Sequence, residues 1–472
     1  MRKNNTLKVL LIAILFTFLL TWILPITYYN GGLFTDTRYP VGLFDMFNYP
    51  TLTLYYFGQM VLYVLAVGAF YGVFNKTGVY RKICDKIAKL FEGKEFIFYP
   101  VVVTLLSVIV AFCGFSYELI FLLPLLTNII LLMKHDKVTV ALTVIGSIAV
   151  GFMGSIFAKD ISYTYMEILG VTYTDLIWYR VIMLVLGIAA LVFNIIYRIK
   201  KMEFKKDDTE KELLAEKIDV KTKKGKVRAN WPAIVVFDLI LVLMIISTLD
   251  FVGAFNVTVF QTFHTKVMQF AIKDYAIFAK VLGSTMQNGY LGNWSNVEFT
   301  TIMVLATIVL AMIYRIKVSD IFDGYKEGAK KFALSALLMV LAYTVLITTS
   351  NHPIILTILK PLMSITNGFN SVTLSVSMFI AGIFNVDAYY TSAFLLPYAM
   401  SVVTDTTLYP LVAFMAQAMQ GLVMLVAPTS IVLLGVVAYL KMNYTVWIKN
   451  VWKFFLEVLL IAFIIFTIIL VV

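Results

Sequence analysis

The sequence is poor in charged residues, cysteine and histidine, and each shortage excludes a class of protein. Only 14% of the 472 residues are charged and 61% are hydrophobic, whereas about a quarter of a soluble domain is charged. The two cysteines, Cys84 and Cys113, fall in a basic loop and an apolar segment, so we expect neither a disulfide nor a redox motif. The three histidines lie near segment ends or in loops, which argues against a buried histidine metal site.

Several sequence motifs of enzymes are also missing. The sequence contains no H-E-x-x-H, no G-x-S-x-G and no dense acidic set, so we do not expect a membrane-embedded enzyme. It contains no P-loop either, so we expect no ATP-driven transport by this chain alone and no cofactor. A net charge of +11 would suit nucleic acid in a soluble protein. Here the basic residues follow the pattern of a membrane protein, and no nucleic-acid partner is predicted.

Long apolar runs are abundant. The mean hydropathy is +0.90, and several segments exceed the roughly 18 apolar residues that mark a membrane-spanning helix. The first run has a charged start but no small-residue cleavage site, so we interpret it as a span and not a signal peptide. We predict an all-α multi-pass membrane protein with about nine spans, at 7–28, 53–74, 136–158, 175–199, 232–253, 298–316, 332–350, 410–440 and 451–472.

Two further apolar stretches, 96–134 and 370–404, are too long for one straight span and are interrupted near their middles. The first is interrupted by "CGFSYE" and the second by "FNVDAYYTS". Each fits either two full helices or a re-entrant hairpin. We favour hairpins because they place 31 of the 38 Lys and Arg residues on one side of the membrane. This topology puts the N-terminus in the cytoplasm of a cell membrane and the C-terminus outside.

The elements form two similar groups separated by polar segments. Both hairpins end in "FLLP", and the offset of 273 residues maps the other elements of 53–199 onto those of 298–472. Counting the crossings gives the two copies opposite orientations. Inverted repeats with broken elements are typical of secondary transporters, which bind substrate near the midplane between the repeats. The remaining segments are 1–52 (first span and outer loop), 200–231 (charged cytoplasmic linker) and 232–297 (linking helix and outer loop with an amphipathic helix at 259–282).

The hairpin interruptions supply the first candidate site residues. Glu118 lies in the run "IVAFCGFSYELIFLLPLL", and an ionisable group inside a membrane is functional by default. It would bind a cation, a proton or a cationic substrate, unless it is a structural carboxylate. Asp387 would bind substrate or cap a half-helix. Their neighbours complete this part of the set: Gly114, Ser116, Asn385, Thr391 and Ser392.

Interruptions inside two predicted spans supply the remaining candidate site residues. Pro428 removes a helical hydrogen bond inside a predicted span, and the freed carbonyls with Thr429 and Ser430 would ligate Na⁺ or a substrate carboxylate. A simple kink is the alternative. The equivalent stretch of the first copy, "GFMGSIFA", contributes Gly154 and Ser155, although its glycines also suit close helix packing. Gln420 is the last candidate.

Four stretches of this sequence resemble a known family. They are "YGVFNKTGVYRKICDKIAKLFEGKE", "GFSYELIFLLPLL", "YKEGAKKFALSALL" and "APTS". They are similar to the YfcC-type carriers, which are grouped with anaerobic four-carbon dicarboxylate carriers and proposed basic amino-acid antiporters in the ion transporter superfamily. The resemblance implies a scaffold domain, a transport domain, a homodimer and elevator-like alternating access. By position, Glu118 matches the second acidic residue of a family motif, and Pro428 to Ser430 match its Pro-Thr-Ser motif.

The sequence departs from the family pattern at Tyr117, "VDAYYTS", Ala158-Lys159 and Gln420, so substrate identity does not carry over. Half-helix N-termini favour an anionic group such as a carboxylate. We found no basic residue firmly at a break, which favours amino acids or short peptides over dicarboxylates. The predicted function is therefore secondary transport of a small charged organic solute across the lipid bilayer, coupled to Na⁺, H⁺ or counter-substrate. A four-carbon dicarboxylate carrier, a channel and a non-transporting scaffold are the alternatives.

Overall fold

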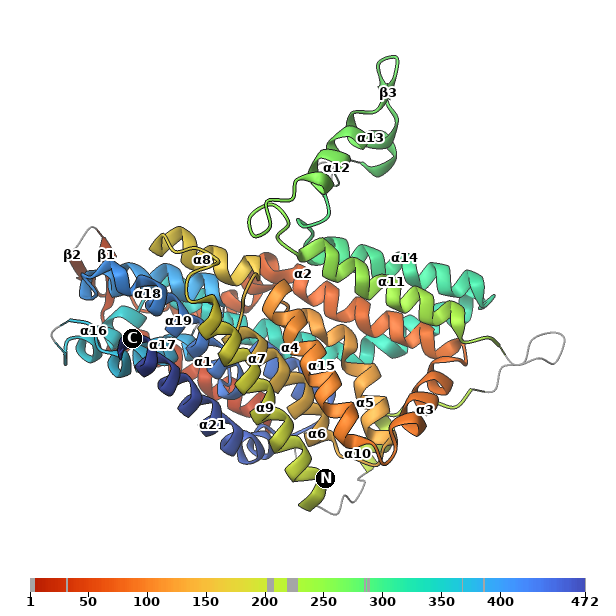
Figure 1. Cartoon of the computed structure of the whole chain (residues 1–472), viewed down its shortest axis with the longest axis horizontal. Helices are drawn as coiled ribbons and strands as arrows, with labels where there is room; N and C mark the ends of the chain where they lie inside the picture. Colours follow the sequence, from red (N-terminus) through yellow and green to blue (C-terminus); the bar gives the residue numbers. More distant parts are fainter. Residues whose placement is uncertain are drawn as a thin grey trace.

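The computed structural model describes the chain except for residues 1–4, 31–32, 202–207, 219–227, 284–285, 287–288, 367, 385–386 and 472. It is an almost entirely helical molecule (Figure 1). Within the described residues, nine segments are long and apolar enough to cross a membrane: α1 (Thr6–Ile23), α2 (Leu43–Lys76), α4 (Glu95–Cys113), α9 (Ile177–Lys201), α11 (Trp231–Thr248), α14 (Asn296–Ile313), α15 (Val318–Asn351), Thr406–Tyr439, and α21 (Tyr444–Val471). The predicted all-α membrane architecture is confirmed.

Shorter elements complete the chain. The helices are α3 (Tyr80–Phe91), η1 (Tyr117–Leu122), α5 (Leu123–Leu132), α6 (Lys137–Ala141), the π-turn η2 (Leu142–Gly146), α7 (Ser147–Met153), α8 (Lys159–Leu169), α10 (Asp208–Leu213), α12 (Val259–Gln269), α13 (Ile277–Leu282), α16 (Ile355–Met363), α17 (Ser371–Phe384), α18 (Ala388–Val402), η4 (Thr406–Leu408), α19 (Tyr409–Val426) and α20 (Ile431–Tyr439). The strands are β1 (Ile26–Asn30), β2 (Leu33–Thr37), β3 (Ala271–Ile272) and β4 (Tyr275–Ala276). β1 pairs antiparallel with β2, and β3 pairs antiparallel with β4.

Several predicted boundaries were wrong at segment ends. The span predicted at 7–28 stops at Ile23, because Pro25 has no N–H to donate, and the hairpin β1–β2 follows it. The amphipathic helix predicted at 259–282 is two short helices around the β3–β4 hairpin, in an arm that projects from the body (Figure 1). The spans predicted at 53–74 and 332–350 were too short. α2 and α15 each have 34 residues, because α2 begins at Leu43 and continues through Pro50, and α15 begins in the polar stretch 318–331 before its apolar run.

Two predicted straight spans are interrupted helices. The segment 136–158 is helical only over Lys137–Met153, contains a π-turn and falls short of a spanning length. The segment 410–440 is broken at residues 427–430, between α19 and α20. The nine candidate spans therefore include α4, which belongs to the first predicted hairpin, in place of 136–158.

Both predicted hairpins are helix–break–helix units. In the first, Tyr99 near the start of α4 lies 2.6 Å from His135 (hydroxyl to Nδ1) just after α5, and Lys134 pairs with Glu92 at 2.7 Å. The two ends of this unit therefore lie side by side. In the second, α17 packs against α18, and residues 385–386 between them are outside the described part. The depth of both units in a bilayer stays a prediction.

Helices at equivalent positions of the 273-residue offset pack against each other in antiparallel pairs. Thr53 of α2 contacts Thr344 of α15, and further along α2 Lys76 pairs with Glu327 at 2.8 Å. Residue numbers therefore rise along α2 while those of its contacts on α15 fall, so the two helices run antiparallel. The pairs α9–α21 and α7–α19 show the same order in their side-chain hydrogen bonds and packing. One interface of the molecule is thus built from matching helices of the two groups.

The α2–α15 pair is the closest of these contacts. Gly68 and Gly72 on α2 face Gly324 and Gly328 on α15. A Cβ added to Gly72 would lie 1.9 Å from the Gly324 carbonyl oxygen, and one on Gly328 would lie 2.0 Å from that of Gly68. Two small-xxx-small motifs therefore bring the backbones into direct contact.

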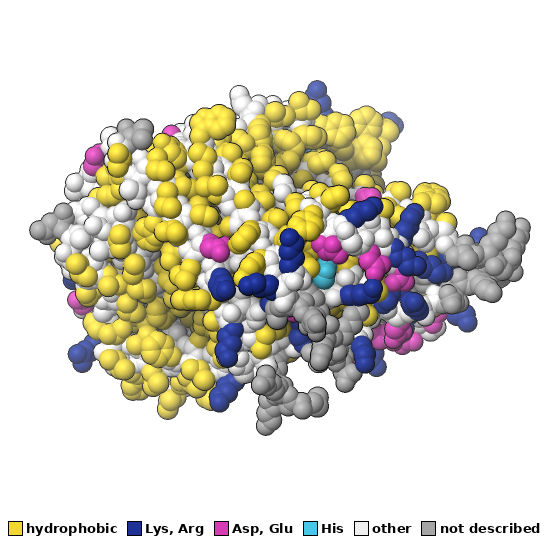
Figure 2. Space-filling view, turned by 60° about the horizontal axis from the view of Figure 1, so that its bottom comes forward, with side chains coloured by type: hydrophobic (Ala, Val, Ile, Leu, Met, Phe, Trp, Pro, Cys, Tyr) yellow, Lys and Arg dark blue, Asp and Glu magenta, His cyan; other side chains and the backbone are white. Residues whose placement is uncertain are grey.

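Charge is distributed unevenly over the surface. Figure 2 shows Lys and Arg side chains gathered at the end that carries α3 and α10, beside a broad hydrophobic surface. The hairpin β1–β2 and helix α16 lie at the opposite end of the molecule (Figure 1). This is the asymmetry that basic cytoplasmic loops would produce.

We expect Gly72→Ala to lower the free energy of unfolding by about 1–3 kcal/mol, because the new methyl group overpacks a backbone contact. Thermal unfolding of purified protein in detergent measures the change. Gly58→Ala on the same helix is the matched control, since nothing lies within 4 Å of its Cβ position. Equal melting temperatures for the two variants would contradict the close crossing.

Candidate transport site

Each group of helices joins its two interruptions by hydrogen bonds at equivalent positions. In the first group, Gly114 ends α4 with a φ of +76°, and the amide of Ile156 in the second break donates to Ala111 of α4 at 2.8 Å. In the second group, the hydroxyl of Thr429 donates to the carbonyl of Ile383 at the end of α17. The chain breaks therefore lie together in each half.

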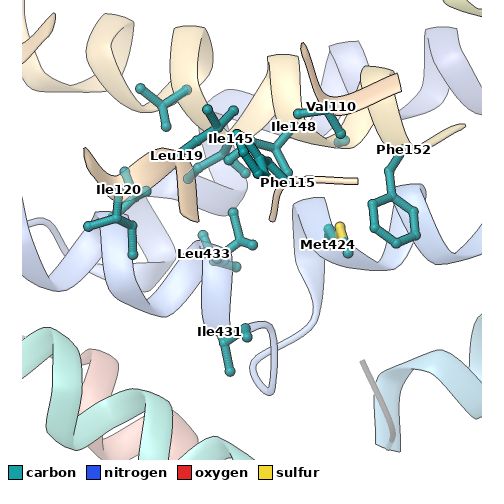
Figure 3. Packing of buried hydrophobic residues seen from close by; sticks show 14 of the residues in the cluster. Val110, Phe115, Leu119, Ile120, Ile145, Ile148, Phe152, Met424, Ile431 and Leu433 are labelled. Carbon is teal, nitrogen blue, oxygen red and sulfur yellow. The ribbon is translucent and has the colours of Figure 1, made fainter. Parts of the chain in front are cut away.

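The two halves meet around these breaks. Figure 3 shows Phe115 and Leu119, on either side of the start of η1, close to Leu433 of α20. Met424 and Ile431 flank the loop between α19 and α20 in the same view. The core of the molecule is thus apolar packing that encloses four irregular stretches of backbone.

The carboxylate of Glu118 accepts hydrogen bonds from the backbone and side chain of the first break itself. Its Oε2 accepts hydrogen bonds from the amide and the hydroxyl of Ser116, at 2.8 and 3.3 Å. The hydroxyl of Tyr63 on α2 donates to the carbonyl of Glu118 at 2.6 Å. The carboxylate therefore holds the turn that starts η1 while remaining only half-buried.

A cavity of about 270 Å³ opens beside Glu118, and it contains a basic residue that sequence reasoning missed. Lys159, the first residue of α8, lines this cavity, and its ammonium donates to the side-chain oxygen of Asn293 at 3.1 Å. Asn296 and Ser295 add polar groups to the wall. A carboxylate and an ammonium thus face one space. The only sequence signal was the departure from the family pattern at Ala158-Lys159.

Asp387 caps the N-terminus of α18, as one of the two interpretations predicted. Its Oδ1 accepts hydrogen bonds from the amides of Tyr389 and Tyr390 at 3.0 and 3.3 Å. The hydroxyl of Thr391 donates to the Asp387 carbonyl at 2.9 Å. Ser392 is buried, and Asn385 lies outside the described residues. A role of Asp387 in binding stays a prediction.

Aromatic residues of α2 and α15 connect the two acidic breaks. The hydroxyl of Tyr343 on α15 donates to Asp387 at 3.2 Å, as Tyr63 on α2 does to the Glu118 backbone. Helix α2 departs from helical geometry at Phe57, whose ring lies 4.4 Å from that of Tyr343. The crossing helices therefore form a shared wall that contacts both breaks.

The Pro428-Thr429-Ser430 break has its hydroxyls bonded to backbone. Ser430 Oγ donates to the carbonyl of Met424 at 3.1 Å and accepts from the amide of Leu433 at 3.3 Å. This arrangement is the one expected for a kink. A Na⁺ site near Thr429 and Ser430 stays a prediction. Gln420 is buried about two turns before the break and packs near Gly382.

The equivalent break in the first half combines close packing with polar support. A Cβ on Gly154 would lie 2.6 Å from Leu184 of α9, so this glycine permits a helix contact. The carbonyl of the buried Ser155 accepts hydrogen bonds from Gln417 at 3.1 Å and from Arg180 at 3.4 Å. The break is therefore tied to both α9 and α19.

Arg180 is a second residue that sequence reasoning missed. Its guanidinium is buried and donates to four backbone carbonyls, those of Tyr173, Asp175, Ser155 and Ile156. A charge inside a predicted span is the same signal that selected Glu118, so it was available in the sequence. Arg180 supplies donors to carbonyls that the interruption of the helix has freed.

These features together define a multi-pass membrane transporter of small organic solutes, a carrier rather than an enzyme. Residues 4–472 match the C4-dicarboxylate anaerobic carrier (DcuC) family, so the chain belongs to that family. Among solved structures it is similar to the YdaH transporter of Alcanivorax borkumensis, with 12% identity and a TM-score of 0.44 over 99% of this chain and 98% of that one. The search of curated proteins found no match.

We expect Arg180→Met to lower the free energy of unfolding by about 1–3 kcal/mol or more, because it leaves buried carbonyls without their donor. Thermal unfolding in detergent is the measurement. Ile182→Met places the same side chain at an exposed position of the same helix and should change little. Arg180→Met unfolding like Ile182→Met would show that the guanidinium does not support the break.

Proposed function

We propose that this carrier transports small carboxylates, with four-carbon dicarboxylates as the first substrate class. The observation that carries the proposal is Lys159 in the cavity beside Glu118. The preference for amino acids in the sequence analysis rested on the apparent lack of a basic residue at a break, and that premise was wrong. Membership of a family of C4-dicarboxylate carriers supports the same substrate class.

The proposed mechanism is alternating access by inverted repeats. Its support is the antiparallel packing of the pairs α2–α15, α7–α19 and α9–α21, in which each partner holds the equivalent position of its group. We propose that both helix–break–helix units are re-entrant, with the N-terminus in the cytoplasm. A homodimer and a YfcC-type specificity belong to this proposal as well.

Glu118 is the proposed coupling group. Its carboxylate lines the same cavity as Lys159, so its charge sets whether the lysine is compensated when no substrate is present. Protonation, or a cation bound nearby, would change that balance when an anion enters. The solute and the coupling ion are then linked through one cavity.

An amino acid is the second candidate. The ammonium of Lys159 and the carboxylate of Glu118 in one cavity suit the carboxylate and the ammonium of a zwitterion. Uptake by purified protein in liposomes separates the candidates. Labelled succinate, aspartate, a neutral amino acid and a dipeptide would be tested with Na⁺, H⁺ and counter-substrate gradients varied in turn. Saturable succinate uptake with counterflow supports the proposal, whereas uptake of the neutral amino acid alone overturns it.

We expect Lys159→Met to reduce dicarboxylate uptake at least about tenfold, the loss that corresponds to one charged hydrogen bond to the solute. Initial rates in liposomes measure the effect. Lys266→Met on the exposed face of α12 removes the same charge from the projecting arm and should leave uptake unchanged. Full activity of Lys159→Met would exclude this lysine from binding.

We expect Glu118→Gln to fold normally and to lose coupled uptake, because an amide keeps the shape of the side chain but removes the charge. Thermal unfolding checks the fold, and uptake driven by each ion gradient checks the coupling. Asp405→Asn, at the N-terminus of the short helix η4 and away from the cavity, is the control. Gradient-driven uptake at the rate of the unsubstituted protein would remove Glu118 from the mechanism.

A further inference from the structure

A segment of the charged linker is docked against the helices. Residues 208–218, here called the strap, consist of α10 and the extended residues that follow it. The side chains of Leu213 and Ala215 are buried although they belong to a polar linker. Burial at these positions shows that the strap packs on the body and is more than a connection between its halves.

The strap is fixed to the first group of helices by specific hydrogen bonds. The amide of Ala215 donates to the side-chain oxygen of Asn128 on α5 at 2.7 Å. The Arg81 guanidinium on α3 donates to the carbonyl of Ala215 at 2.9 Å. Glu210, also buried, accepts from the amide of Lys137 at 3.2 Å.

The strap also reaches the second group. Glu212 forms an ion pair with Lys441, which follows α20. Between the groups lies a cavity of about 450 Å³, bounded by the glycine crossing of α2 and α15 and by the strap. The strap therefore bridges elements that alternating access would move relative to each other.

Without the strap, the charge in this cavity is predominantly basic. Lys330, Lys331 and Lys441 line it against the single acidic residue Glu327. Lys76 already pairs with Glu327 at 2.8 Å. The strap brings two more carboxylates to the same cavity.

These two carboxylates are those of Glu212 and Glu216, which also line the cavity. Glu212 pairs with Lys441, and Glu216 lines the cavity together with Lys330 and Lys331. The strap thus presents two carboxylates on one short segment to a group of lysines, as a dicarboxylate would.

We propose that the strap is an autoinhibitory latch, and that its two glutamates occupy a binding site for carboxylates in the cavity lined by these lysines. The proposal rests on the proposed function, because the solute that competes for the lysines is a small dicarboxylate. When the anion binds, the strap leaves, and the two groups of helices are free to move.

The position of the strap can be tested without measuring transport. Ala215→Cys places a thiol at a buried position, and both native cysteines are buried, so background labelling by a water-soluble maleimide is low. We expect labelling of this thiol about fivefold to tenfold faster when Glu212→Gln and Glu216→Gln are added, the change expected from loss of two partly exposed charge contacts. Succinate should accelerate labelling when the glutamates are present.

The matched control is Glu92→Gln. Glu92 forms an exposed ion pair with Lys134, whose ammonium lowers the pKa of the Glu92 carboxyl, and it does not line the cavity. Its removal should leave labelling at Ala215→Cys unchanged. The Ala215→Cys protein must first show the thermal unfolding of the unsubstituted protein.

Transport supplies the second readout. We expect Glu212→Gln with Glu216→Gln to raise the initial rate of succinate uptake several-fold, and a reducible cross-link between Glu212→Cys and Lys441→Cys to stop uptake until it is reduced. Undiminished uptake by the cross-linked protein overturns the latch, as does unchanged labelling in the glutamate variants. If the glutamate variants expose the thiol but no protein takes up or responds to a dicarboxylate, the proposed substrate class fails while the docked strap stands.

Discussion

The structure depends on one constraint, the need to satisfy every backbone polar group where helices break inside an apolar body. A bilayer offers no water to freed amides and carbonyls, so irregular backbone persists only where protein supplies partners. Each break in this molecule has hydrogen-bond partners of its own. Glu118 and Asp387 accept from amides at the starts of helical segments, Ser430 does so for α20, and Arg180 donates to the carbonyls freed near Ser155.

The same constraint limits how the molecule can move. The glycines of α2 and α15 bring two backbones into contact. A crossing packed this tightly does not deform gradually, because its atoms are already in van der Waals contact. In the proposed alternating access, motion of the two halves would be rigid-body sliding or rotation about packed surfaces. Tyr63 on α2 donates a hydrogen bond to the carbonyl of Glu118, and Tyr343 on α15 donates one to Asp387. A shift of the two crossing helices would therefore change a hydrogen bond at each acidic residue.

The sequence predicted what depends on local composition. Apolar length identified eight of the spans, and small or polar residues marked both hairpin breaks. The interruption at Pro428 was found, although the span around it was drawn as continuous. The lengths of α2 and α15 were missed, because α2 begins at Leu43 and continues through Pro50, and α15 begins in a polar stretch outside the apolar run. Arg180 carries the same signal as Glu118, a charge inside a predicted span, but it lies near the end of 175–199, where a basic residue also fits the outer edge of a helix.

The cavity that Lys159 shares with Glu118 could not be predicted from the sequence for a different reason. The two residues are 41 positions apart, and the break at 154–158, which bonds back to α4, brings them to one cavity. No periodicity encodes that arrangement. The strap is a similar case, since Leu213 and Ala215 look like ordinary linker residues until Asn128 and Arg81 are placed beside them.

Both cavities described above combine lysines with carboxylates of the chain. A carrier of anions needs basic residues, yet an uncompensated ammonium in a low-dielectric interior is costly whenever the solute is absent. Glu118 lines the same cavity as Lys159, and Glu212 pairs with the partly exposed Lys441, so each lysine has a carboxylate of the chain itself nearby. In the proposed mechanism, the internal carboxylate and the anionic solute compete for the same lysine. The cost of displacing the carboxylate would then set the affinity for the solute, and a proton or cation that neutralises the displaced carboxylate would enter the transport cycle.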